Sequence, residues 1–114
     1  MSDPGEELWQ HPRWSWREGM RDRAGVRVFD LELFDATTAP DLTDAATAGI
    51  LLGLLDELGR LTDVVKQGAE WIVAVDLPED GVQGWAADTM GEAAAYALLG
   101  LWEALDAVPQ DVDE

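Results

Sequence analysis

The chain has 114 residues, of which 47% are hydrophobic and 27% charged, and its formal net charge is −17. This length supplies one modest core, because a domain of this size buries roughly two-thirds of the surface that its unfolded chain exposes. The absence of cysteine excludes disulfides, thiolate metal sites and cysteine nucleophiles. The sequence shows no apolar run near the roughly 18 residues of a membrane span and no signal peptide, so we expect a cytoplasmic protein that does not bind membranes.

The negative charge is unevenly distributed along the chain. Residues 1–27 hold five acidic and five basic side chains, so residues 28–114 carry the whole net charge of −17. Such a surface repels nucleic acids and attracts cationic partners. A salt-adapted or high-GC proteome produces the same composition, so the acidity alone assigns no function.

Residues 1–24 are predicted to form an irregular Trp/Arg-rich N-terminal arm, because prolines and glycines interrupt any regular period. The arm has two possible roles. In the first, it binds a partner protein through the side chains of Trp9, Trp14, Trp16, Arg13 and Arg17. In the second, which we favour, the indoles pack on the domain and the arginines neutralise its acids, because exposed tryptophan lowers solubility.

The first strand is predicted over residues 25–34, where apolar side chains alternate with Asp30 and Glu32. A helix is expected from about residue 42 to residue 61, because Asp41 and Asp44 offer N-terminal caps and the apolar positions that follow recur at helical spacing.

A second strand is predicted over residues 70–77, and its apolar side chains on both faces favour a central place in the sheet. Turn residues follow, and residues 82–86 are expected to pair back as a hairpin. Thr89 and Glu92 form a capping box that begins a final helix over residues 90–107. The small Ala and Gly residues of that helix predict that it is covered on two sides or that it contacts a second copy in a homodimer.

The order of these elements predicts a small two-layer α+β domain over residues 25–108. Two helices are expected to pack on one face of a three- to four-stranded antiparallel or mixed sheet. Residues 109–114 are predicted to form an acidic tail.

The residue types offer little for catalysis. His11 is the only histidine and lies in the predicted arm, and the glycines match no phosphate-binding motif, so we expect neither an enzyme nor a bound cofactor. A Mg²⁺ or Ca²⁺ site made by Asp30, Glu32 and Asp76 is conceivable on neighbouring strands. A solvated strand face explains the same residues better, and we expect no metal site.

Several short patterns together span most of residues 14–105. They are Trp14-x-Trp16-x-x-Gly19-Met20, Pro40-Asp41-Leu42-x-Asp44-x-Ala46-Thr47-x-Gly49-x-Leu51-Leu52, Trp71-x-Val73, and Gly91-Glu92-Ala93 with Ala97-Leu98-Leu99. In these patterns the chain resembles small uncharacterised accessory proteins encoded by bacteriophages and prophages of high-GC bacteria. The resemblance transfers no activity to any residue. It implies a phage accessory context, in which small proteins act by binding host machinery.

These observations favour a non-enzymatic acidic interaction module that binds a host or phage protein through the arm and the last helix. The alternative is a nucleic-acid mimic that inhibits a host defence or transcription protein, as anti-restriction and anti-CRISPR proteins do. Its partner would be a basic nucleic-acid-binding protein, and the chain would not bind nucleic acid directly. The acidic surface proposed for this contact comprises Asp30, Glu32, Asp76, Glu79 and Asp80.

Overall fold

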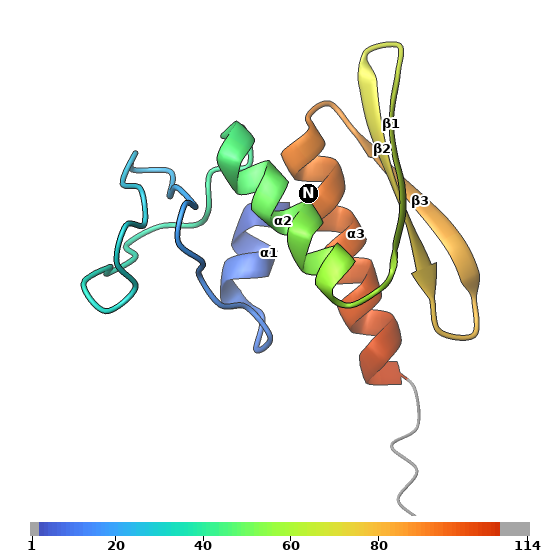
Figure 1. Cartoon of the computed structure of the whole chain (residues 1–114), viewed down its shortest axis with the longest axis horizontal. Helices are drawn as coiled ribbons and strands as arrows, with labels where there is room; N and C mark the ends of the chain where they lie inside the picture. Colours follow the sequence, from blue (N-terminus) through green and yellow to red (C-terminus); the bar gives the residue numbers. More distant parts are fainter. Residues whose placement is uncertain (1–2, 108–114) are drawn as a thin grey trace, which may run out of the picture.

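The computed structural model describes residues 3–107. Its elements, in chain order, are α1 (Pro4–Gln10), α2 (Ala45–Glu57), β1 (Leu61–Gln67), β2 (Glu70–Leu77), β3 (Gly81–Ala87) and α3 (Met90–Ala107). The helices lie on one side of the antiparallel sheet, with α3 next to it (Figure 1). The predicted two-layer α+β fold is confirmed, and the described part of the chain has three helices where two were expected.

The sheet has the strand order β1-β2-β3, so the prediction that residues 70–77 form its central strand is confirmed. Val73 pairs with Val64 of β1 and with Trp85 of β3. Val73 and Val75 have no exposed surface. The face of β2 that carries them packs on α3, and no described element covers the opposite face of the sheet.

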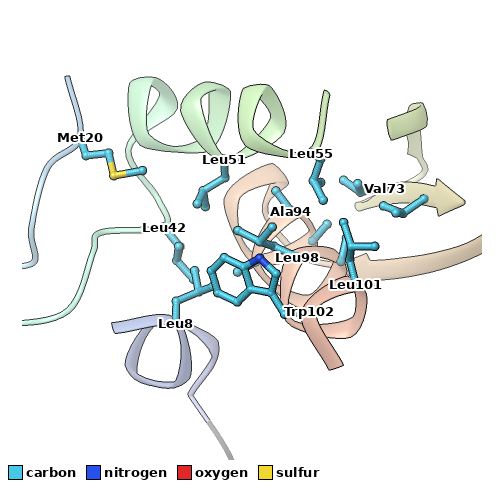
Figure 2. Close-up of a cluster of buried hydrophobic side chains, with 14 of the residues drawn as sticks. Leu8, Met20, Leu42, Leu51, Leu55, Val73, Ala94, Leu98, Leu101 and Trp102 are labelled. Atoms are coloured by element: carbon cyan, nitrogen blue, oxygen red, sulfur yellow. The ribbon is translucent and has the colours of Figure 1, made fainter. Parts of the chain in front are cut away.

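Helix α3 is the centre of the core and contacts α1, α2, β2 and β3. Its small residues bring these elements close, and its fully buried positions are Ala93, Ala94, Ala95, Ala97, Leu98 and Leu101. Figure 2 shows Leu8 of α1 and Leu51 of α2 pointing toward Leu98 and Trp102 of α3. The expectation that this helix is covered on two sides is confirmed.

Local capping sets where two helices begin. The backbone N–H of Glu92 donates to Thr89 Oγ1 at 3.1 Å, which confirms the capping box at the start of α3. Asp44 caps α2 by accepting from the backbone N–H of Thr47 at 3.0 Å, so the helix begins three residues later than predicted. It ends at Glu57, because Gly59 has a φ of 70° and turns the chain into β1.

The prediction of a strand over residues 25–34 is wrong. Within the described chain this segment makes one isolated bridge, between Arg21 and Arg27, and otherwise forms turns and bends. Asp30 Oδ1 accepts from the backbone N–H of Glu32 at 3.0 Å, a local bond that curls the chain. The physical reason for the difference is that β1 and β3 occupy both positions beside β2.

Strand β1 is not among the predicted elements, and its first residue, Leu61, is the last residue of the predicted helix. It pairs with β2 through a hairpin in which Gln67 is opposite Glu70. Gly68, in the two-residue loop between them, has a φ of 63°, a conformation that glycine adopts without a steric penalty.

The predicted irregularity of the arm is wrong for residues 4–10, which form α1. Pro4 occupies the first turn, where proline is tolerated, and Asp3 Oδ1 accepts from the backbone N–H of Gly5 at 3.0 Å. Leu8 is fully buried in the core, and the ring of His11 stacks on Trp102 with centroids 4.6 Å apart. The predicted tail, residues 109–114, lies outside the described residues. None of the helices in residues 3–107 is long and apolar enough to cross a bilayer.

Candidate functional site

The tryptophans of the predicted arm are half-buried. Trp14 and Trp16 pack against the core and meet edge to face, with ring centroids 5.4 Å apart. Trp16 also meets Phe34 at 4.9 Å, and Trp9 lies on α1. Two of the three predicted partner-binding indoles therefore hold the N-terminal segment onto the domain.

The arginines of the same segment pair with acids on the helices. Arg13 lies 2.8 Å from Asp106 of α3, and Arg17 lies 3.2 Å from Glu57 of α2. These side chains are about half exposed, so each pair contributes at most about 1 kcal/mol to stability. Their main effect is to reduce the acidity of this side of the molecule.

A cleft of about 280 Å³ separates the N-terminal segment from α2 and α3, and we call it the arm cleft. It is lined by Arg13, Trp14, Ser15, Arg17, Leu54, Glu57, Leu58, Leu98 and Trp102. Three of the five predicted partner-binding residues therefore come together here, whereas Trp9 and Trp16 do not line the cleft. The indole N–H of Trp14 is buried, and nothing within residues 3–107 accepts its hydrogen bond.

Residues 26–35 form an exposed loop, which we call the apolar loop. It lies at the opposite end of the molecule from the sheet (Figure 1). The side chains of Phe29 and Leu33 are each 83% exposed, and Val26 and Leu31 are 51% and 45% exposed. An isolated exposed leucine is ordinary in a folded protein, but Val26, Phe29 and Leu33 line one shallow hollow, and grouped exposed apolar side chains are typical of a contact surface.

The base of the apolar loop is fixed to the domain. Val28 is buried, its backbone N–H donates to the carbonyl of Met20 at 2.7 Å, and its carbonyl accepts from the N–H of Gly19 at 2.8 Å. Arg27 pairs with Asp44, whose side chain is 11% exposed. The hydrogen bonds from Arg27 and Thr47 hold the pKa of the Asp44 carboxyl well below its usual range, although burial opposes this effect.

The five residues predicted to form one acidic surface lie in two separate places. Asp30 and Glu32 belong to the apolar loop, whereas Asp76 lies on β2, and Glu79 and Asp80 lie in the turn after it. Asp76 is 4.0 Å from Arg60. Within residues 3–107 no three histidine or acidic side chains are grouped so that they could hold a metal ion.

A second hollow, which was not predicted from the sequence, lies between α3 and β3, one of the two edge strands of the sheet. This β3–α3 groove has a volume of about 330 Å³ and is lined by Leu77, Asp80, Trp85, Gly100, Glu103, Ala104 and Ala107. The sequence of β3 could have indicated this surface, because it has no charged residue in a chain that is rich in charged residues.

Comparisons of this chain with protein-family models, with curated proteins and with solved structures find no match.

Proposed function

We propose that this protein is a non-enzymatic interaction module that docks onto a partner protein through the apolar loop. The observation that carries the proposal is the exposure of Phe29 and Leu33, 83% each, on a loop whose base is held in place. Following the resemblance noted above, we propose a phage-type accessory protein that binds a host or phage protein in the cytoplasm of the host cell.

Phe29 and Leu33 offer a large apolar surface to a partner. Complete burial of a Phe or Leu side chain contributes about 1.5–3 kcal/mol, so these two residues supply a useful part of a binding free energy. The attachment of Val28 and Arg27 to the domain reduces the ordering that binding requires. Asp30, Glu32 and Asp35 lie among the apolar residues and favour a partner with basic residues around an apolar pocket.

The Trp/Arg-rich segment has a supporting role in this proposal. Trp16 contacts Phe34 at the end of the apolar loop. At the base of the loop, the backbone carbonyl of Met20 accepts a hydrogen bond from the N–H of Val28. The segment thereby positions the loop instead of forming the contact itself. In the arm cleft, Glu57 is paired with Arg17.

The experiment is affinity capture from a host lysate by the tagged protein and by the double variant Phe29→Ser/Leu33→Ser. Val65→Ser is the matched control, because Val65 is a 40% exposed valine on β1. We expect the wild type and the control to retain the same partner at high salt, and the loop variant to lose it. Equal recovery by all three proteins would exclude the apolar loop as the contact.

A second candidate function, nucleic-acid mimicry, is favoured by the charge that remains after internal pairing. Residues 56–107 hold eleven acidic side chains, of which Glu57, Asp76 and Asp106 lie within ion-pair distance of arginines, so eight remain against Lys66. Carboxylates on a folded surface compete for Lys and Arg sites that bind phosphates.

Mimicry predicts that the captured partner is a basic nucleic-acid-binding protein that elutes with salt and is displaced by duplex DNA. It also predicts that neutralising Glu79 and Asp80 weakens capture more than neutralising Asp30 and Glu32, because the sheet half carries more of the unpaired charge. A partner that DNA does not displace would contradict mimicry and leave the apolar loop as the explanation.

A further inference from the structure

We propose that the β3–α3 groove binds an extended cationic peptide segment of a partner, which adds to β3 as a fourth strand. A Lys or Arg side chain of this segment would enter the groove beside Trp85, between the carboxylates of Asp80 and Glu103. This site is separate from the apolar loop, and it does not depend on the function proposed above.

The β3 edge of the sheet is open. Strand β3 is at the border of the sheet, and no segment of residues 3–107 pairs with its free side. Its sequence, GVQGWAA, contains no charged residue and no proline. Proteins usually protect an edge strand with charges, prolines or bulges, and the opposite edge strand β1 does so with Asp63, Lys66 and a bulge. The backbone donors and acceptors of β3 are therefore available to an added strand.

Small residues of α3 keep the groove open beside this edge. A Cβ at Gly100 would overlap the ring of Trp85, so glycine allows the indole to lie directly on α3. Ala104 and Ala107 continue the same side of the helix and line the hollow. A strand that pairs with β3 places alternate side chains on this face of the sheet, where the groove can receive one of them.

The acidic side chains of the groove are complementary to a cationic segment. Asp80 and Glu103 are exposed, and neither pairs with a basic side chain within the described residues. An indole with carboxylates beside it is a suitable environment for a Lys or Arg side chain. The same sheet already shows such a contact, because Lys66 Nζ lies 5.6 Å from the ring centroid of Trp71.

The charge also argues against a second copy of this chain as the occupant. Each copy carries a net charge of −17, and acids flank β3 at both ends, at Asp80 and Asp88. Antiparallel pairing of two β3 strands would bring these like charges together and repel the copies. An extended segment with basic residues has the opposite charge at the same positions.

The test uses the full chain and three labelled peptides, with binding followed by fluorescence anisotropy at physiological salt. The first peptide alternates Val with Lys and Arg, the second replaces the basic residues with Glu, and the third replaces alternate Val with Pro. We expect binding of the first peptide alone, because Glu reverses the charge and Pro removes backbone donors. Equal binding of the proline peptide would overturn strand addition.

Matched variants locate the site. Asp80→Asn/Glu103→Gln should weaken binding about tenfold or more through the loss of two charge-assisted contacts. Asp63→Asn/Glu70→Gln removes the same charge from β1, the opposite edge strand, and from the β1–β2 hairpin, and should change affinity less than about twofold. Equal weakening by the two pairs would reduce the interaction to general attraction of opposite charges and overturn the groove as its site.

A steric variant and a backbone readout complete the test. Ala104→Leu fills the groove without a change of charge and should abolish peptide binding, with folding checked by circular dichroism.

Hydrogen exchange of the amides of residues 81–87 should slow when the peptide binds, and that of residues 61–67 should not. Unchanged exchange in β3, or a dimer in light scattering that the peptide does not dissociate, would overturn the proposal. The variant Phe29→Ser/Leu33→Ser should bind the peptide normally, which separates this site from the apolar loop.

Discussion

The guanidinium of Arg27 donates to both carboxylate oxygens of Asp44, each at 2.9 Å. It also donates to the backbone carbonyl of Gly19 at 2.7 Å. Asp44 in turn caps α2 through the backbone N–H of Thr47. One ion pair therefore connects the apolar loop, the N-terminal segment and the start of a core helix, and the orientation of the proposed contact depends on it.

The first prediction concerns the cap. Asp44→Ala should lower the free energy of unfolding by about 1–2 kcal/mol or more, because both the N-cap side chain and the partner of Arg27 are lost. Asp56→Ala, at an exposed position on the same helix, should change the free energy by less than about 0.5 kcal/mol. Urea unfolding of the two variants checks this, and equal effects would mean that the cap does not stabilise α2.

The second prediction is a pH dependence. The pKa of Asp44 is lowered in the folded protein from its ordinary value of 3.8, chiefly by the hydrogen bond from Arg27. A carboxyl whose pKa is lowered by folding stabilises the fold at pH values above its ordinary pKa. This contribution is lost as the pH falls from the ordinary pKa toward the lower pKa of the folded state. The stability difference between the wild type and Asp44→Asn should therefore be constant above about pH 5 and shrink below about pH 4.

Unfolding free energies measured across this range provide the test. Comparison with Asp44→Asn isolates one carboxyl from the many others of the chain. A stability difference between the two proteins that grows as the pH falls would contradict the lowered pKa of Asp44.

The third prediction concerns Gly91. A Cβ at this position would overlap the carbonyl group of Leu42, which is rigid backbone. Gly91→Ala should lower the free energy of unfolding by about 1–3 kcal/mol or more. Gly49→Ala places its Cβ in open space on α2 and should stabilise the protein by about 0.5–1 kcal/mol. Chemical denaturation gives both values, and a neutral Gly91→Ala would mean that the α3 backbone can move away from Leu42.

The fourth prediction tests whether α1 belongs to the core. Leu8 is fully buried, so Leu8→Ala should lower the free energy of unfolding by about 2–5 kcal/mol. Gln10→Ala, at an exposed position of the same short helix, should have little effect. If thermal and urea unfolding of Leu8→Ala matched the wild type, the N-terminal segment would be an appendage and not part of the domain.

Several features of the fold could be predicted because their causes are local. The Thr89–Glu92 pair begins α3 through two bonds between neighbours in the chain. The apolar run of residues 70–77 predicted a central strand, and β2 lies between β1 and β3. The interpretation of the N-terminal arginines as partners for acids is confirmed by the ion pairs of Arg13 and Arg17.

Other features depended on competition between distant segments. Residues 25–34 have the stronger alternation, yet β1 occupies the place beside β2, because a two-residue hairpin brings it there at a small loss of chain entropy. The same competition left Phe29 and Leu33 exposed, and no local pattern distinguishes them from buried strand residues. The β3–α3 groove likewise joins residues from a turn, a strand and a helix.

Neighbouring residues thus determine where α3 begins, which run is apolar enough for the sheet centre, and where the charge is concentrated, because capping, periodicity and net charge are properties of short stretches of chain. Packing determines which of two strand-like segments joins the sheet, that α1 contributes Leu8 to the core, and which apolar side chains remain at the surface. These outcomes depend on contacts between segments that are distant in the sequence. Each such contact is stable only when the other elements of the fold are in place.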